Sequence, residues 1–164
     1  MNRIVREQEN PVVTQIILFA LLLWAGMVAG ISFLEAPVKF AAPQVTLAIG
    51  LGIGRLVFGW LNKFELLFSL VVMAGLFYNR APFRIWTPVL LLSAVLFVQT
   101  NWLLPALDAR ALQIIAGKIP GPSKLHFVYV TLEIFKLGLL LGTASAIFRQ
   151  QFVPQSNRRV PAYN

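Results

Sequence analysis

The residues best suited to do chemistry lie on one stretch of the sequence: His126, Tyr129, Glu133 and Lys136, spaced by three and four residues. A helix turns about 100° per residue and would place all four within about 80° of arc, as one polar stripe. Glu133 and Lys136 are three residues apart, so they can form an ion pair on that face. Such a stripe could relay a proton, bind an ion or hold a small molecule, or it could fix helix register through hydrogen bonds alone.

Metal and cofactor chemistry find little support in the composition. The chain contains one histidine and no cysteine, which excludes thiolate metal sites, iron–sulfur clusters and haem held by two histidines. His126 would begin a helix, and a metal needs several ligands at suitable spacing. We therefore expect no metal and no cofactor. Positioned acids and bases alone define no reaction, so no catalytic residue is assigned and enzymatic activity is not favoured.

The overall composition predicts an all-α integral membrane protein. Of the 164 residues, 58% are hydrophobic and only 12% are charged, whereas soluble domains carry about 25% charged residues. A chain this apolar suits a lipid solvent, in which helices satisfy their own backbone groups. The net charge of +8 then favours contact with anionic lipid headgroups of the bilayer over binding of nucleic acid.

Four apolar segments are long enough to cross a bilayer, which takes about 20 residues. We predict one domain over residues 1–153, a polar disordered tail over 154–164, and a four-helix bundle whose spans cover about residues 12–34, 60–78, 85–104 and 125–148. Pro37, Pro82 and Pro105 fall at the predicted boundaries. Four spans put both termini on one side, and a slight excess of Lys and Arg there predicts that this side is cytoplasmic.

The segment Gln44–Gly59 is apolar and rich in glycine, and Arg55 interrupts it. A single helix from Gln44 to Tyr78 would be about 52 Å long, well beyond a hydrocarbon core of roughly 30 Å. We therefore predict a short interfacial or re-entrant helix between the first two spans. One tilted, kinked helix is the alternative.

The other spans offer partners for the polar stripe. The second and fourth spans begin, and the third ends, on the same side of the bundle, so polar residues near those positions should converge with the stripe: Asn62, Glu65, Gln99 and Asn101. Two pairs of glycines spaced by four residues would let helices approach closely: Gly26 with Gly30, and Gly138 with Gly142.

Several short elements resemble one family. The run Phe97–Pro105, followed by Asp108 and Arg110, resembles the end of the third helix in the transmembrane protein 205 family and its bacterial DUF4149 relatives. His126-Phe127 matches the start of their last helix, and Gly30–Phe33 with Pro37 loosely matches the end of the first. The resemblance implies a small four-helix membrane protein whose biochemical activity is not established. Thr131, Glu133 and Lys136 depart from the small or amide residues typical of that family.

The leading functional hypothesis is a small multi-pass membrane protein that binds or passes a small solute or ion through its polar cluster. One alternative is an accessory subunit that packs against a larger membrane complex or against a second copy of the chain. The other is a membrane enzyme that transfers protons through His126, Glu133 and Lys136.

Overall fold

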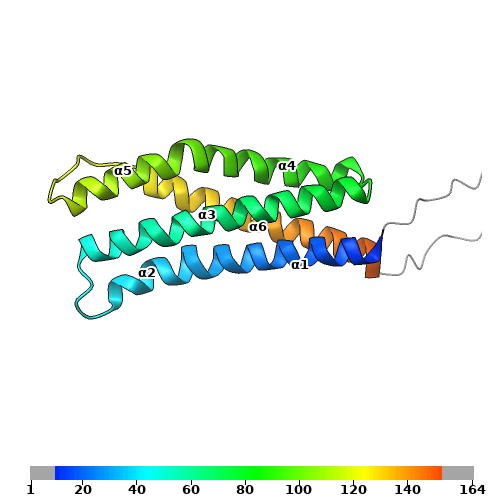
Figure 1. The fold of residues 1–164 in the computed structure, drawn as a ribbon, viewed down its shortest axis with the longest axis horizontal. Helices are drawn as coiled ribbons and strands as arrows, with labels where there is room; N and C mark the ends of the chain where they lie inside the picture. The colour runs from blue at the N-terminus through cyan, green and yellow to red at the C-terminus, as the bar shows by residue number, and fades with distance from the viewer. Residues whose placement is uncertain (1–9, 153–164) are drawn as a thin grey trace, which may run out of the picture.

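The computed structural model describes residues 10–152, so the tail predicted over residues 154–164 lies outside the described part of the chain. Within residues 10–152, every regular element is helical. The elements form four long antiparallel rods (Figure 1). The first rod runs through α1 (Pro11–Val28), the π-helix η1 (Ala29–Glu35), α2 (Ala36–Val38) and the 3-10 turn η2 (Lys39–Ala41). The second is α3 (Leu47–Tyr78); the third joins α4 (Phe83–Val98), the π-helix η3 (Gln99–Leu103) and α5 (Leu104–Ile115); the fourth is α6 (Leu125–Phe152).

Local sequence signals set several rod ends. The Asn10 side chain accepts a hydrogen bond from the Val12 amide, and Pro11 occupies the first turn of α1, where its missing N–H is not needed. Thr46 caps α3 by accepting from the Ile49 amide at 3.3 Å. Beyond α5, Gly117 adopts a positive φ of 77°, which glycine tolerates without steric strain. The first residue of α1 and the last turn of α6 lie at the same end of the bundle (Figure 1).

The predicted short helix between the first two spans is wrong. From Leu47 onward this segment forms the first part of α3, one uninterrupted 32-residue helix, as in the single-helix alternative. Thr46 starts the helix, and no proline lies between Pro43 and Pro82. The intervening glycines lower helix propensity by only about 1 kcal/mol each, which packing against neighbouring rods can offset.

The first and third rods also run further than their predicted spans, to Ala41 and Ile115. Pro37 and Pro105 were expected to mark helix ends, yet both lie inside their rods, just after the π-helical segments η1 and η3. Each proline takes a position in the first turn of the α-helix that follows, where a missing N–H is tolerated. A π-helical turn shifts the hydrogen-bond pattern by one residue, so the rod continues through the proline.

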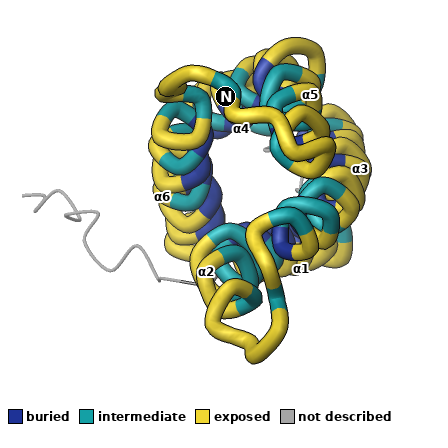
Figure 2. The backbone as a smooth tube through the Cα atoms, turned by 90° about the vertical axis from the view of Figure 1, so that its left-hand side faces the viewer, coloured by how far each residue is buried: buried dark blue, intermediate teal, exposed yellow. Residues whose placement is uncertain are grey.

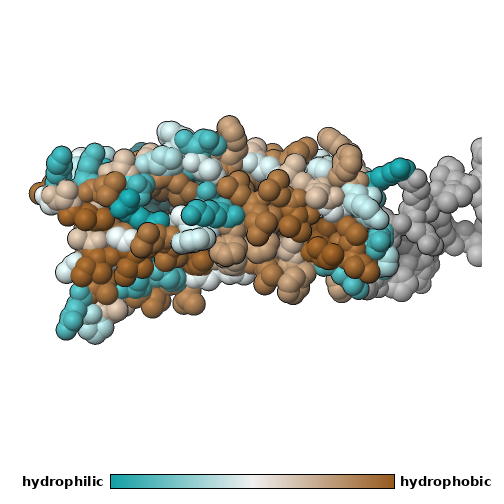
Figure 3. Space-filling view, viewed as in Figure 1, coloured by the Kyte–Doolittle hydropathy of each residue, from teal (hydrophilic) through white to brown (hydrophobic). Residues whose placement is uncertain are grey.

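The four rods pack in a ring, with α1 and α4 each against both α3 and α6, and Figure 2 shows this arrangement end-on. The half of the bundle nearer the termini has a dry apolar core built around fully buried side chains: Leu21, Trp24, Val28, Val72, Leu92 and Leu140. The face of the bundle drawn in Figure 3 also carries many hydrophobic residues, with hydrophilic ones among them. Leu56, Leu70 and Phe77 are 66–78% exposed.

The predicted packing glycines face outward. A Cβ added at Gly26, Gly30, Gly138 or Gly142 would meet no heavy atom within 4 Å, so these residues do not bring rods of this chain together. Close packing occurs at other glycines. A Cβ at Gly75 would lie 2.6 Å from Ile17 of α1, and one at Gly50 would lie 2.2 Å from the ring of Phe40.

Candidate functional site

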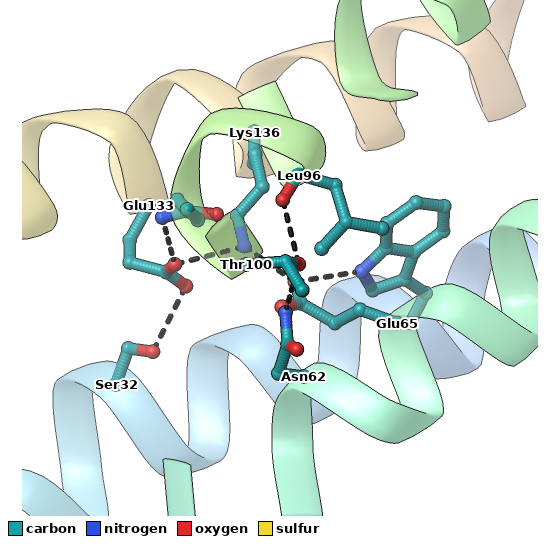
Figure 4. Close-up of polar contacts among 9 residues, drawn as sticks. Ser32, Asn62, Glu65, Leu96, Thr100, Glu133 and Lys136 are labelled. Atoms are coloured by element: carbon teal, nitrogen blue, oxygen red, sulfur yellow. Dashed lines mark hydrogen bonds and ion pairs between the residues drawn. The ribbon is translucent and has the colours of Figure 1, made fainter. Parts of the chain in front are cut away.

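Three charged side chains meet in the interior, halfway along the bundle. Lys136 of α6 places its Nζ 2.5 Å from Glu65 Oε1 of α3 and 2.8 Å from Glu133 Oε1 of its own helix. All three are at most 2% exposed. A buried charge is tolerated only when it is paired and hydrogen-bonded, and here one ammonium bridges two carboxylates (Figure 4).

The other two rods supply the remaining ligands of these carboxylates. Trp24 Nε1 of α1 donates to Glu65 Oε1 at 2.9 Å, and Gln99 Nε2 of η3 donates to Glu133 Oε1 at 2.9 Å. Ser32 of η1 donates to Glu133 Oε2 at 3.0 Å. Every rod therefore contributes to one network, which we call the polar cluster: Trp24, Ser32, Glu65, Gln99, Glu133 and Lys136.

Both π-helical segments take part in the cluster. Ser32 lies in η1 and Gln99 in η3. The wider turn of a π-helix changes the direction of the side chains that follow, and such segments are often found at functional sites. Gln99 is 1% exposed, and its Oε1 has no hydrogen-bond partner within the described residues. The cluster thus has unused acceptor capacity.

A cavity of about 820 Å³ opens beside the cluster, lined by residues of the rod ends that lie away from the termini. Four polar side chains, one from each rod, form the part of its lining nearest the cluster: Ser32, Asn62, Thr100 and Tyr129. We call this part the floor. Ser32 bonds directly to Glu133, Asn62 lies one turn before Glu65, and Thr100 adjoins Gln99. The floor is therefore the boundary between the cavity and the buried charges.

The walls of the cavity are apolar and aromatic, with two ion pairs among them. Arg55 of α3 pairs with Asp108 of α5, and their second contact, Nη2 to Oδ2, measures 3.1 Å. Lys39 pairs with Glu35 at 3.1 Å. The Lys39 ammonium also lies 5.3 Å from the ring centroid of Phe58. Both cations that line the walls therefore already have carboxylate partners.

The cavity has no continuation toward the other end of the bundle. Beyond the cluster lies the apolar core, and at the far end Asn79 joins the rods by donating to Thr14 Oγ1 at 2.9 Å and accepting from the Asn10 amide at 3.1 Å. The void beside that contact is only about 20 Å³. In the described part of the chain, the large cavity is open at one end.

The structure brings most of the predicted site residues together. Glu65, Gln99, Glu133 and Lys136 belong to the polar cluster. Asn62 and Tyr129 lie on the floor, and His126 lines the cavity as an exposed residue. Asn101 lies apart, because it is exposed and its Nδ2 donates to the Phe97 carbonyl of its own rod at 2.8 Å.

Sequence reasoning missed several members of the site. Trp24 carries the one indole N–H in an uncharged apolar run, and Ser32 is polar near the end of that run, so a search for polar atoms in apolar segments would have found both. The Arg55–Asp108 pair joins residues 53 positions apart, and no local pattern indicates it. Among residues 10–152, no group of three or more His, Cys, Asp or Glu side chains is placed to hold a metal ion.

Fold and site together define an all-helical four-rod bundle with a one-ended cavity above a buried charged cluster. Comparison of the chain with models of protein families, with characterised proteins and with solved structures finds no match.

Proposed function

We propose that this chain is a multi-pass membrane protein that binds a small solute in the one-ended cavity. The observation that carries the proposal is a cavity of about 820 Å³ whose floor contacts a fully buried ion-paired cluster. Ligand sites are typically concave, mostly apolar and about 300–1,000 Å³ in volume, with a few placed polar groups. Ionisable residues inside a membrane bundle are functional candidates by default.

The length and surface of the rods support the membrane setting. Each of the four is long and apolar enough to cross a membrane. Trp60 and Trp102, which lie two residues from the paired Asn62 and Thr100, are 59% and 56% exposed. Tyr78 lies nearer the termini along α3 and is 68% exposed. Trp60 and Tyr78 are separated by about 27 Å of helix, close to the thickness of a hydrocarbon core whose interfaces favour Trp and Tyr. This band would place the cavity beside the membrane interface, open to water.

The dry core favours binding over passage. A solute that reached the floor would meet Trp24, Val28 and Leu140, all 0% exposed, before it reached the other end. The family resemblance noted above is consistent with a four-helix membrane protein and adds no activity. We propose that the termini are cytoplasmic, because the full sequence has seven Lys and Arg on the side of the termini against six on the other side, a slight excess that the positive-inside rule favours.

Single-cysteine labelling tests the cavity directly, because the chain has no native cysteine. We expect Thr100→Cys, on the floor, to react with a water-soluble maleimide in sealed vesicles, and only from the side that also labels Ala116→Cys beyond α5. Leu92→Cys, in the dry core, is the matched negative control and should remain unlabelled. If Thr100→Cys and Leu92→Cys were equally unreactive while Ala116→Cys reacted, the cavity would be closed to water and the proposal would fail.

The outward glycines favour a second candidate function, that of a subunit docked on another membrane protein. Gly26 of α1, Gly30 of η1, and Gly138 and Gly142 of α6 have open space where a side chain would lie. Lipid-facing small residues allow close approach of a partner helix. Purification from native membranes tests this candidate: a stoichiometric partner that is lost in Gly138→Leu supports it, whereas a lone chain in both variants contradicts it.

A further inference from the structure

Building on the proposed solute-binding function, we propose that the ligand of the cavity is an organic cation with an apolar body, a substituted ammonium or phosphonium ion. Its charge would lie against the floor, above the polar cluster, and its body against the aromatic walls. Three independent features of the cavity lead to this class of ligand.

The first feature is the set of hydrogen-bonding atoms on the floor. Thr100 donates its proton to the Leu96 carbonyl at 2.8 Å, so it can only accept from Asn62, whose Nδ2 lies 2.9 Å away. This contact fixes the orientation of the Asn62 amide and leaves its oxygen for another donor. Ser32 likewise uses its proton on Glu133. The floor therefore presents mainly acceptor oxygens to a ligand.

The second feature is the balance of charge around the cavity. The polar cluster and the wall ion pairs contain four carboxylates, those of Glu35, Glu65, Asp108 and Glu133, and only three cations, Lys39, Arg55 and Lys136. The same end of the bundle also carries Lys63, Arg110, Lys118 and Lys124, but none of these residues lines the cavity. Lys63 lies over the Trp60 ring at 4.1 Å, and Arg110 donates to the Gly121 carbonyl. The two cations of the lining, Lys39 and Arg55, already have carboxylate partners, so a bound anion would find no free cation in the lining, whereas a bound cation would lie near the carboxylates of Asp108 and Glu133.

The third feature is the aromatic character of the walls, to which Phe33, Phe40 and Phe58 contribute. Aromatic faces attract cations as well as apolar groups. Lys39 already makes such cation–π contacts with these walls, because its ammonium lies 5.3 Å from the Phe58 ring centroid and 5.7 Å from the Phe40 ring centroid. Phe58 is held edge-on against Tyr129 at 5.3 Å between centroids, so these surfaces are preorganised.

Tetraphenylphosphonium and tetraphenylborate make a matched pair of probes, because they share one shape and carry opposite charges. Binding is measured by equilibrium dialysis against phosphatidylcholine nanodiscs with and without the purified chain. We expect saturable binding of the phosphonium alone. Glu133→Gln should weaken it by on the order of tenfold, the effect of removing one nearby negative charge. Lys39→Gln removes a wall cation and should tighten it.

Filling the cavity gives a control for the place of binding. Ala111 lines the cavity, whereas Ala109 is exposed on the same helix and does not. Ala111→Phe should therefore abolish phosphonium binding, and Ala109→Phe should leave it unchanged. Thermal unfolding of each variant separates a lost site from a lost fold.

Two results would overturn the cation inference: borate binding as tight as phosphonium binding, or no phosphonium binding by a folded chain. In either case, labelling of Thr100→Cys by the maleimide would still support a solute-binding cavity. Loss of that labelling would refute the proposed function itself.

Discussion

At the scale of single residues, the central feature is one ammonium held between two carboxylates. Lys136 is fully buried and contacts both Glu65 and Glu133. Taking one partner out of such a group leaves the others buried without compensation, and this is usually more destabilising than the intact group is stabilising. Coulombic repulsion between the two carboxylates would add to the effect.

We predict that Lys136→Met lowers the free energy of unfolding by about 3–5 kcal/mol, measured by chemical denaturation in a mild detergent. Lys63→Met is the matched control, because Lys63 is exposed beside Trp60 and its loss should change stability by less than about 0.5 kcal/mol. Equal effects of the two substitutions would show that the ion pairs of Lys136 do not hold the bundle together.

At the scale of elements, glycine matters where one helix crosses another closely. Gly75 of α3 faces Ile17 of α1, which is 1% exposed, so the space there is already filled. Gly138 of α6 has only open surroundings. The spacing of four residues predicted that Gly138 packs against another helix. Whether a glycine allows close packing depends instead on the face of the helix on which it lies.

We predict that Gly75→Ala destabilises the bundle by about 1–3 kcal/mol through overpacking. Gly138→Ala, the same change on the outer surface, should be neutral or should stabilise α6 by up to about 1 kcal/mol through higher helix propensity. Thermal unfolding of both variants is the measurement. A reversed order of stability would mean that Gly138 is packed and Gly75 is not.

At the scale of the whole molecule, the cavity and the core divide the bundle into a hollow half and a closed half. The hollow half holds the floor and its ion pairs, and the closed half is filled by apolar side chains. The charged cluster lies at their boundary. A continuous water path would have to cross the apolar core.

We predict that liposomes containing the chain show no more passive proton flux than protein-free liposomes, because apolar side chains seal the closed half. Flux is followed with a pH-sensitive dye after an imposed gradient, and an added channel-forming peptide confirms that the vesicles respond. Flux that rises with the amount of protein, and falls in Glu133→Gln, would instead favour a relay through the cluster.

The helical class and the number of long apolar rods could be predicted from the sequence, because hydrophobic runs and charge depletion are local properties that a short window reveals. The sequence also indicated the stripe of Tyr129, Glu133 and Lys136, since helical spacing alone puts these residues on one face. The helix ends predicted from prolines and glycines were wrong at several positions. Pro37, Pro105 and the glycines before Arg55 are usual breakers, yet π-helical turns and packing allow the rods to continue through them.

Which polar residues meet and which face outward depends on how the rods pack against one another. Asn101 and Gln99 are two positions apart, yet Asn101 is exposed, whereas Gln99 is buried in the polar cluster with 1% of its surface exposed. Trp24 and Ser32 are hydrogen-bonded in that cluster, and Arg55 forms an ion pair with Asp108. This is because the rotation of each rod about its axis follows from packing against its two neighbours in the ring. The π-helical turns shift that rotation partway along, and no local pattern of residues specifies the result.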